Sequence, residues 1–465
     1  MKVDFKNIEQ IYFLGIGGIG MSALARYFNS MGKSVSGYDK TPTKLTDELI
    51  QEGIPVHFED NIKFIPASIK ELPYKIENIL IVYTPAVPKD HKEFIYFKEN
   101  GFVIKKRAEV LGMITENSYT VAVAGTHGKT TTSSLIAHIL KTGNLDPSAF
   151  LGGITQNYET NLLLGSNLES ENNLVVVEAD EYDRSFLTLH PEIAVITSVD
   201  ADHLDIYGDE KYMQESYSLF ARQVKSKLIV KRSIESKIDS GRRAITYSIS
   251  DDRADFFAQN IKISNGFYYY EIVTPTNIFT DVTLGLPGLH NVENSVAAVA
   301  VVSELNISEA AIKLALKTFG GVKRRFDYQI KTDSMVFIDD YAHHPEELKA
   351  TINSVKEMYP DKKITGVFQP HLFSRTRDFA DDFARSLDLL DECILMEIYP
   401  ARELPMEGVT SQMLLDKMKS TNKSISQKND LVSDILKREI EVLLTLGAGD
   451  IDTFVEPIKN ALINK

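Results

Sequence analysis

A glycine-rich segment that contains a lysine and two threonines carries the strongest chemical signal in the chain. Gly125-Thr126-His127-Gly128-Lys129-Thr130-Thr131 lies between a predicted strand, Thr120–Ala124, and a predicted helix, Thr131–Lys141. Glycines let backbone N–H groups surround phosphate oxygens, and the start of a helix adds partial positive charge. Lys129 can reach terminal phosphates and the Thr130 hydroxyl can bind Mg²⁺. The segment predicts a nucleotide site rather than a chance turn, although Val123 stands where the standard P-loop has its first glycine.

Two apolar runs downstream of this segment each end in a group of acidic residues. The run Leu174–Val177 leads to Glu178, Asp180, Glu181 and Asp183, and the run Ile193–Val199 leads to Asp200, Asp202, His203 and Asp205. In open parallel sheets, ligands bind beyond the carboxyl ends of the strands, where the phosphate-binding loop also lies. A carboxylate there can hold the Mg²⁺ that bridges nucleotide phosphates. We therefore expect a magnesium site, with a solvated acidic loop as the alternative.

A second glycine-rich segment lies near the N-terminus. Gly15, Gly17, Gly18 and Gly20 satisfy the G-x-G-x-x-G pattern between a predicted strand, Ile11–Leu14, and a predicted helix, and Asp39 follows. Such glycines allow a pyrophosphate to approach the backbone, and the acidic residue can accept a ribose hydroxyl. Any diphosphate can use this cradle, so NAD and other diphosphate ligands both fit, and a tight turn without a ligand is the remaining alternative.

Histidines and arginines in the second half of the chain are further candidates. His290, His343, His344 and His371 lie in motif-like segments, with a hydrogen-bonded structural role as the alternative for each, Arg324 and Arg325 lie just past a proposed hinge at Gly320-Gly321, and Arg375 and Arg377 lie in a strand-to-helix loop. The segment Asp339–Pro345 follows a strand and opens a helix, which is a favoured place for functional polar groups. Arginines placed in this way suit bidentate recognition of phosphate or carboxylate, with surface ion pairing as the alternative.

The elements that position these residues are short strands alternating with helical patterns. At about 150 residues per domain, 465 residues predict about three domains. Strand–helix alternation predicts parallel βαβ units, and the segment from about 244 to 286 is β-rich. We therefore predict an α/β fold of three α/β domains in series, at residues 1–107, 108–321 and 322–465.

Charge and cysteine content limit the partners. The net charge of −14 argues against nucleic acid and anionic membrane surfaces, and no apolar run is long enough for a membrane span. Cys393 is the sole cysteine, so no internal disulfide can form, which fits a reducing cytosol. We expect a cytoplasmic protein without membrane insertion, either a monomer or a weak homodimer.

The order of motifs resembles the Mur ligase family over nearly the whole chain. The matching segments are GIGGIGMSALA, GTHGKTTT, EADEYDRSF, DADHLDIY, HNVEN, RRFD, DDYAHHPEE and FQPHLFSRTRDF. The resemblance implies a Rossmann-like N-terminal domain that binds a UDP-sugar, a central P-loop ATPase domain with a parallel sheet and a β-rich insertion, and a Rossmann-like C-terminal domain that closes over ATP and the amino acid. It implies ATP and Mg²⁺ as cofactors, and UDP-N-acetylmuramate and L-alanine as substrates joined through an acyl phosphate in peptidoglycan synthesis.

The resemblance also implies roles for individual residues. Lys129, Glu178, His203, Asn294, Arg325 and Asp340 match catalytic positions, and Thr130, Glu178 and His203 match magnesium ligands. ATP positions are Gly125, Thr126, His127, Gly128, Lys129, Thr130, Thr131, His290, Asn291, Asn294, Arg325 and Asp340. Substrate positions are Gly15, Gly17, Gly18, Gly20, Asp39, Thr84, Tyr341, His343, His371, Arg375 and Arg377. Leu372 departs from the commoner family pattern, which has Arg, so Arg375 or Arg377 is expected to take more of that contact.

Three other functions are compatible with parts of this pattern. A recycling ligase that adds a preformed tripeptide to the same UDP-sugar shares several motifs. An NAD-dependent dehydrogenase accounts for Gly15–Gly20 but leaves the P-loop unexplained. An ATP-dependent switch or scaffold is the non-enzymatic alternative.

Overall fold

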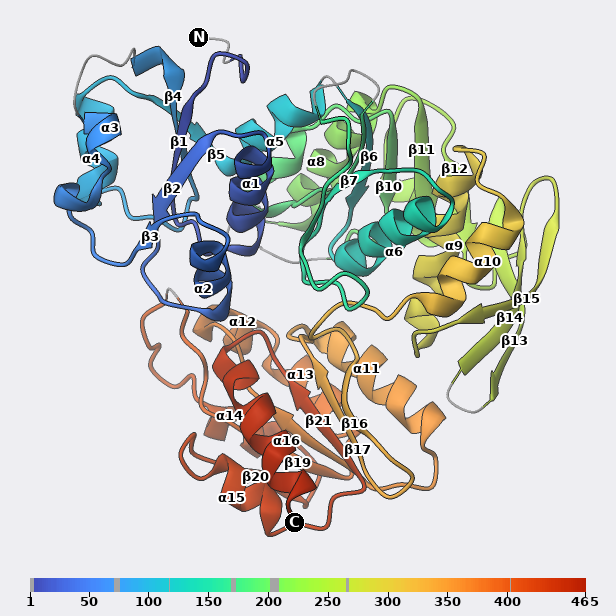
Figure 1. Ribbon diagram of the computed structural model, residues 1–465. Coiled ribbons are helices and arrows are strands. Elements are labelled where there is room, and N and C mark those ends of the chain that lie inside the picture. Colours follow the sequence, from blue (N-terminus) through green and yellow to red (C-terminus); the bar gives the residue numbers. More distant parts are fainter. Residues whose placement is uncertain are drawn as a thin grey trace. The chain divides into compact units, whose positions relative to one another are not determined.

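The computed structural model describes residues 4–70, 76–116, 118–168, 173–200, 209–264, 267–401 and 403–465. The chain forms two compact units. The first comprises residues 1–257, 272–278 and 294–315, and the second comprises 258–271, 279–293 and 316–465. Three sheets organise these units (Figure 1). Within the described residues, no helix has the length and apolarity needed to cross a bilayer.

The first sheet has five parallel strands in the order β3-β2-β1-β4-β5. These are β1 (Gln10–Leu14), β2 (Ser34–Tyr38), β3 (Val56–His57), β4 (Ile79–Tyr83) and β5 (Val103–Lys106). The helices around it are α1 (Ile19–Ser30), α2 (Lys44–Gln51), α3 (Ala67–Lys70), α4 (Lys92–Glu99) and α5 (Arg107–Glu116). Every residue of β1 is buried, as expected for a central parallel strand covered on both faces.

The second sheet has ten strands in the order β15-β14-β13-β12-β11-β10-β6-β9-β7-β8. Its strands are β6 (Tyr119–Ala124), β7 (Ser148–Phe150), β8 (Leu162–Leu163), β9 (Leu174–Glu178), β10 (Ile193–Ile196), β11 (Lys227–Lys231), β12 (Ile245–Ser248), β13 (Phe256–Ser264), β14 (Phe267–Val273) and β15 (Ile278–Leu284). Its helices include α6 (Lys129–Thr142), α8 (Glu210–Gln223), α9 (Leu289–Ser303) and α10 (Glu309–Thr318). In β14, buried and more exposed residues alternate, a pattern typical of a sheet with one face toward water.

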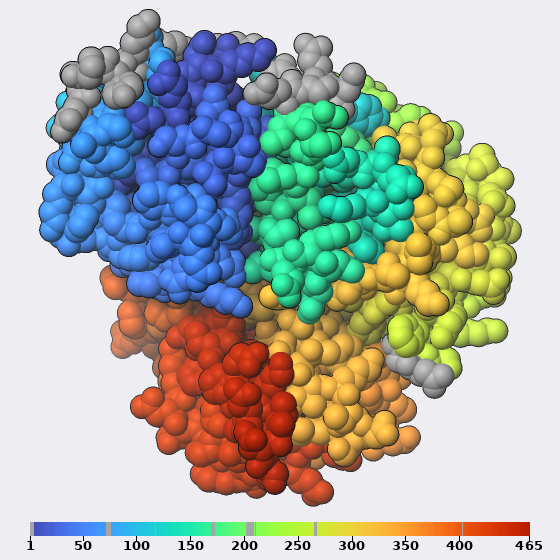
Figure 2. Space-filling view, in the orientation of Figure 1, coloured from blue at the N-terminus to red at the C-terminus, as the bar shows by residue number. Residues whose placement is uncertain are grey.

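Within the first unit, α1 contacts the second sheet. The Arg26 Nη1 donates to Asn161 Oδ1 at 2.7 Å, and the Asn161 amide donates to Ile19 O and, at 3.1 Å, to Ser22 Oγ. Tyr27 of α1 packs on Phe150 of β7 with ring centroids 5.3 Å apart. In Figure 2 the blue N-terminal surface accordingly adjoins the green surface of the central segment. Helix α1, which follows the N-terminal glycine-rich segment, is thus anchored to the sheet that carries the central glycine-rich segment.

The third sheet has six strands in the order β16-β17-β21-β18-β19-β20, and all its pairings are parallel except that of β16 with β17. Its strands are β16 (Asp327–Lys331), β17 (Val336–Asp340), β18 (Ile364–Phe368), β19 (Glu392–Leu395), β20 (Lys423–Ile425) and β21 (Val442–Leu446). Its helices are α11 (Pro345–Met358), α12 (Phe373–Asp378), α13 (Ala380–Leu387), α14 (Ser411–Lys417), α15 (Leu431–Leu436) and α16 (Val455–Ile463). One apolar core contains side chains of α11, α13 and α14, and a separate one contains those of α15 and α16, so helices cover both faces.

Candidate functional site

The central glycine-rich segment forms a tight loop between β6 and α6. Gly125 and Gly128 have φ of +138° and +81°, and a Cβ at Gly125 would lie 2.0 Å from Thr197 Oγ1. Only glycine therefore fits at position 125. Helix α6 has no side-chain cap at Gly128 and no acidic residue in its first turn. Its N-terminus is consequently suited to an anion, as the sequence predicts.

Polar side chains from the end of β10 hold the loop. The Ser198 Oγ lies 2.8 Å from Thr126 Oγ1 and accepts from His127 N at 2.8 Å. Asp200 N donates to Thr126 Oγ1 at 3.1 Å, and Asp200 Oδ2 lies 3.7 Å from His127 Nε2. Thr126 and His127 thus shape the loop, whereas its backbone remains the natural phosphate partner.

Lys129 is held at the loop by the buried carboxylate of Glu181, which belongs to the acidic group predicted beside the loop but was not predicted to pair with Lys129. Its Nζ donates to Gly125 O at 2.6 Å and lies 2.9 Å and 2.8 Å from the two carboxylate oxygens of Glu181. The Glu181 side chain is 2% exposed. Burial lowers the pKa of Lys129, but Glu181, with Glu178 and Asp180, outweighs burial and raises it. Lys129 is therefore a cation at neutral pH, ready to meet phosphate.

Glu178 lies beside the same loop because β9 pairs with β6. In the parallel register Glu178 is opposite Val123, and Glu178 Oε2 accepts from Gly152 N at 3.0 Å. Thr130, at the start of α6, is 7% exposed. A hydroxyl and a carboxylate are hard oxygen donors of the kind that Mg²⁺ accepts while it keeps several waters, so both residues fit the ion. Within the described residues no group of three His, Cys, Asp or Glu side chains forms a metal cage, and His203 lies outside those residues.

Helix α9 brings predicted nucleotide residues to both units. In the first unit, a Cβ at Gly128 would lie 2.7 Å from Asn294 Oδ1, so the Asn294 carboxamide packs on the loop. In the second unit, Asn291 Nδ2 donates to Pro287 O at 2.6 Å. Burial, with a smaller contribution from Arg325, lowers the pKa of His290 to about 4, so its imidazole is neutral at pH 7.

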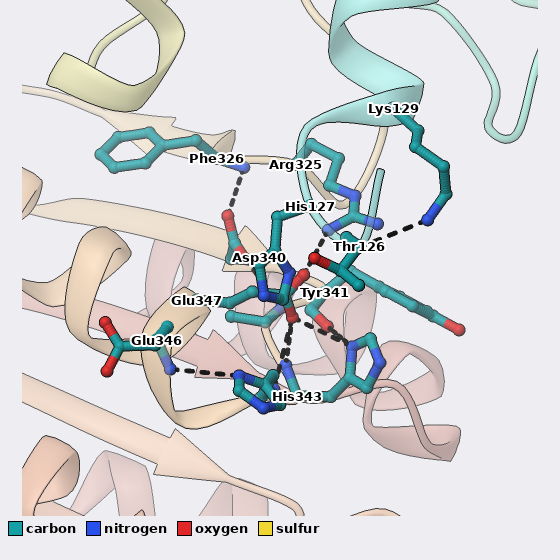
Figure 3. A network of polar contacts seen from close by, with 12 residues as sticks. Thr126, His127, Lys129, Arg325, Phe326, Asp340, Tyr341, His343, Glu346 and Glu347 are labelled. Atoms are coloured by element: carbon teal, nitrogen blue, oxygen red, sulfur yellow. Dashed lines mark hydrogen bonds and ion pairs between the residues drawn. The ribbon is translucent and has the colours of Figure 1, made fainter. Parts of the chain in front are cut away.

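Asp340 ends β17 and is clamped by backbone groups (Figure 3). Its Oδ2 accepts from Phe326 N at 2.7 Å and its Oδ1 accepts from Ala342 N at 2.8 Å. Burial raises the pKa of Asp340 to about 6, and Arg325 opposes that rise. The neighbouring Asp339 is also buried, accepts from Thr445 Oγ1 at 2.7 Å and lies 3.5 Å from Arg324 Nε.

Glu347 organises the loop that follows Asp340, a role that the sequence analysis missed. Its Oε2 accepts from His343 N at 3.1 Å and from His344 N at 3.3 Å, and its Oε1 lies 3.7 Å from Arg325 Nη1 (Figure 3). The Arg325 guanidinium lies over the Tyr341 ring at 5.0 Å. The spacing from His344 to Glu347 is that of a capping box, and this signal was available in the sequence.

The predicted amino-acid residues divide into two groups. The rings of His343 and His371 are 6.2 Å apart, and His371 stacks on Tyr399 at 5.7 Å, so the structure brings these residues together. Arg375 is 8% exposed in α12, whereas Arg377 is exposed and pairs with Asp378 at 2.7 Å. Leu372 caps α12 with φ of +70°, a conformation that strains a residue with a Cβ.

The N-terminal glycine loop is held by the acidic residue predicted for it. Asp39 Oδ2 accepts from Gly17 N at 2.7 Å, and Asp39 Oδ1 accepts from Thr41 N at 3.1 Å. Gly15 has φ of +87°, and a Cβ there would lie 2.5 Å from Thr84 Cγ2. Asp39 and Thr84 therefore define the shape of the loop. Each Asp39 oxygen accepts one backbone N–H group and can accept a further donor, so this geometry does not distinguish NAD from another diphosphate ligand.

Three family models match consecutive parts of the chain. They are described as Mur ligase family, catalytic domain (residues 10–119), Mur ligase middle domain (123–302) and Mur ligase, glutamate ligase domain (324–449). A relative from Flavobacterium johnsoniae is named UDP-N-acetylmuramate–L-alanine ligase. It is 52% identical over 462 residues, which are 99% of this chain and 99% of the relative. The chain belongs to the Mur ligase family.

Solved structures of Mur ligases resemble this one. The UDP-N-acetylmuramate-alanine ligase of Thermotoga maritima is 28% identical, with a TM-score of 0.80 over 98% of this chain and 99% of that one. A murein peptide ligase from Psychrobacter arcticus is 23% identical, with a TM-score of 0.72 over 98% and 99%, and shares the fold. The predicted family, and an α/β fold with three domains, are confirmed for this Mur ligase.

Proposed function

We propose that the chain is an ATP-dependent ligase that joins L-alanine to the carboxylate of UDP-N-acetylmuramate in peptidoglycan precursor synthesis. The observation that carries the proposal is the 52% identity, over 99% of both chains, to a relative with that name. The rival recycling ligase has weaker support, because the murein peptide ligase structure is 23% identical and informs on fold alone.

We assign the UDP-sugar to the first sheet. Its diphosphate is proposed to bind at the loop that contains Gly15, Gly17, Gly18 and Gly20, at the N-terminus of α1. Helix α1 has no side-chain cap and no acidic residue in its first turn, which supports an anion there. Asp39 and Thr84 are assigned to the substrate site through their hold on this loop.

We assign ATP to the central glycine loop and α9, through Gly125–Thr131, Asn294, His290 and Asn291, with Arg325 and Asp340. Mg²⁺ is proposed to be held by Thr130, Glu178 and His203, where it would neutralise phosphate charge when bound. L-Alanine is assigned to Tyr341, His343, His371, Arg375 and Arg377. Domain boundaries at residues 107 and 321, a cytoplasmic location and a monomer or weak homodimer stay predictions.

The proposed reaction has two steps. A carboxylate oxygen of the muramate attacks the γ-phosphorus of ATP, the bond to the bridging oxygen breaks, and ADP leaves. The amine of L-alanine then attacks the acyl carbon of the acyl phosphate, inorganic phosphate leaves, and the amine loses a proton. Lys129, a cation held at the loop, is placed to stabilise the charge on the transferring phosphoryl group.

The proposal is tested by phosphate release from ATP in the presence of UDP-N-acetylmuramate. We expect release that depends on L-alanine and is not supported by the preformed tripeptide alone. Turnover with the tripeptide and none with L-alanine would identify the recycling ligase instead. Absence of release with either amine, together with tight NADH binding, would support the dehydrogenase alternative.

A further inference from the structure

Arg107, which is not among the residues proposed to bind a substrate, lies against the N-terminal glycine loop. It is the first residue of α5, directly after β5, and its side chain is 21% exposed. A Cβ placed on Gly20 would lie 2.9 Å from Arg107 Nη1, 3.2 Å from Cδ and 3.5 Å from Cζ. The guanidinium therefore lies against Gly20, the fourth glycine of the segment, in the first turn of α1.

Only part of this guanidinium is used by the protein. Nη2 donates to Asp180 Oδ2 at 2.9 Å, and Asp180 Oδ1 is fixed by Tyr182 N at 3.0 Å. Within the described residues, Nε and Nη1 donate to no acceptor. Nη1 is also the guanidinium atom that a Cβ on Gly20 would approach most closely. An arginine with unused donors beside an anion-binding loop is suited to phosphate, because its planar fork matches two oxygens.

The local electrostatics favour an anion at this point despite the charge of −14 for the whole chain. The first turn of α1 contains no acidic residue, and its N-cap, Gly18, offers no side chain. The nearby Lys106 is neutralised by Asp183, with Nζ and Oδ2 2.8 Å apart. Asp180 forms an ion pair with Nη2 of Arg107 and leaves Nε and Nη1 unused. These two donors and the N-terminus of α1 both attract an anion.

We infer that Arg107 is a binding residue for the diphosphate of the nucleotide-sugar, and that its Nε and Nη1 donate to phosphate oxygens at the N-terminal glycine loop. This inference rests on the proposed function, which supplies the nucleotide-sugar. Glycine is also required at position 20 to leave room for Arg107, because a side chain there would displace the guanidinium. Asp180 is the positioning residue that orients Arg107 from the end of β9.

The test is calorimetric binding of UDP and of UDP-N-acetylmuramate to the full chain. Arg107→Ala and Arg107→Gln are expected to weaken both ligands by a similar factor, about 10- to 100-fold, as for loss of hydrogen bonds to a charged group. Arg107→Lys is expected to recover part of the affinity. Binding of a non-hydrolysable ATP analogue should stay unchanged, which also shows that the variants are folded.

Arg222→Ala is the control. Arg222 is an exposed arginine at the end of α8 in the same unit, and its guanidinium donates to Asp239. We expect its removal to leave UDP affinity unchanged. The inference is overturned if Arg107 variants bind UDP like the wild type, if they lose affinity for UDP-N-acetylmuramate alone, or if Arg222→Ala weakens UDP equally. The proposed function is tested separately: a wild-type chain that binds UDP but releases no phosphate from ATP with L-alanine would contradict that function and not the role of Arg107.

Discussion

Replacing Glu181 by glutamine tests the role of the buried carboxylate that holds Lys129. The Lys129 ammonium donates to Gly125 O at 2.6 Å, to Thr126 O at 3.4 Å and to Glu181 Oε1 at 2.9 Å, and it lies 2.8 Å from Glu181 Oε2. A phosphate that reaches Lys129 must therefore take over contacts that Glu181 makes with it. The substitution Glu181→Gln keeps the size of the side chain and removes its charge.

The expected effect has two parts of opposite sign. Removing one partner of a buried ion pair costs about 3–5 kcal/mol. Because a glutamine oxygen still accepts one hydrogen bond and Gly125 O remains, we expect the free energy of unfolding to fall by about 2 kcal/mol. ATP no longer competes with a carboxylate for Lys129, so we expect its affinity to rise by about tenfold, or about 1.4 kcal/mol.

Urea unfolding with and without a non-hydrolysable ATP analogue measures both parts. The variant should be less stable alone and should gain more from the nucleotide than the wild type gains. Asp381→Asn is the control, because it breaks an ion pair of similar length, 2.7 Å to Lys417, at an exposed site, and little change is expected. Unchanged stability, or weaker nucleotide binding, in Glu181→Gln would refute this account of Lys129.

Three further predictions concern other residues. Glu178→Ala should abolish ATP turnover while the calorimetric affinity for UDP-N-acetylmuramate stays near wild type; a folded variant that loses the UDP-sugar contradicts the metal assignment. Burial raises the pKa of Glu93 to about 7, so the folded protein keeps a proton on this carboxyl that the unfolded chain releases near pH 4.5. The stability that this proton contributes is lost as pH rises from about 4.5 through 7, so the melting temperature of Glu93→Gln should rise relative to that of the wild type across that window. Melting temperatures that change with pH in the same way in both proteins would contradict this. Burial raises the pKa of the Cys393 thiol, so a thiol reagent should modify the native protein only at its unfolding rate, and rapid labelling without urea would contradict it.

The sequence allowed the chemistry of the two glycine loops to be predicted because local spacing determines it. A loop between a strand and a helix needs glycine at positive φ, and Gly125 and Gly128 satisfy that need within four residues. The acidic ends of β9 and β10 were also predictable, since apolar runs buried on both faces mark central parallel strands. The three-domain α/β fold followed from the same alternation.

Contacts between residues that are far apart in the sequence could not be predicted from local spacing. Glu181 meets Lys129 only because β9 pairs with β6, and they are 52 positions apart. Arg107 marked a domain boundary in the sequence, while its contact with Gly20 depends on how α5 packs beside α1. Predicted helix boundaries also shifted: the helix expected over Thr131–Lys141 is α6, which begins at Lys129 and ends at Thr142. Such differences arise because tertiary packing overrides local pattern.

The central claim, that the muramate carboxylate is activated by phosphoryl transfer, is tested most directly by following its oxygen. UDP-N-acetylmuramate labelled with ¹⁸O in the carboxylate is incubated with the chain, ATP and L-alanine, and the released phosphate is analysed by mass spectrometry. An acyl phosphate transfers one labelled oxygen to each phosphate formed, and the account predicts that result. Unlabelled phosphate released together with the amide product would contradict it.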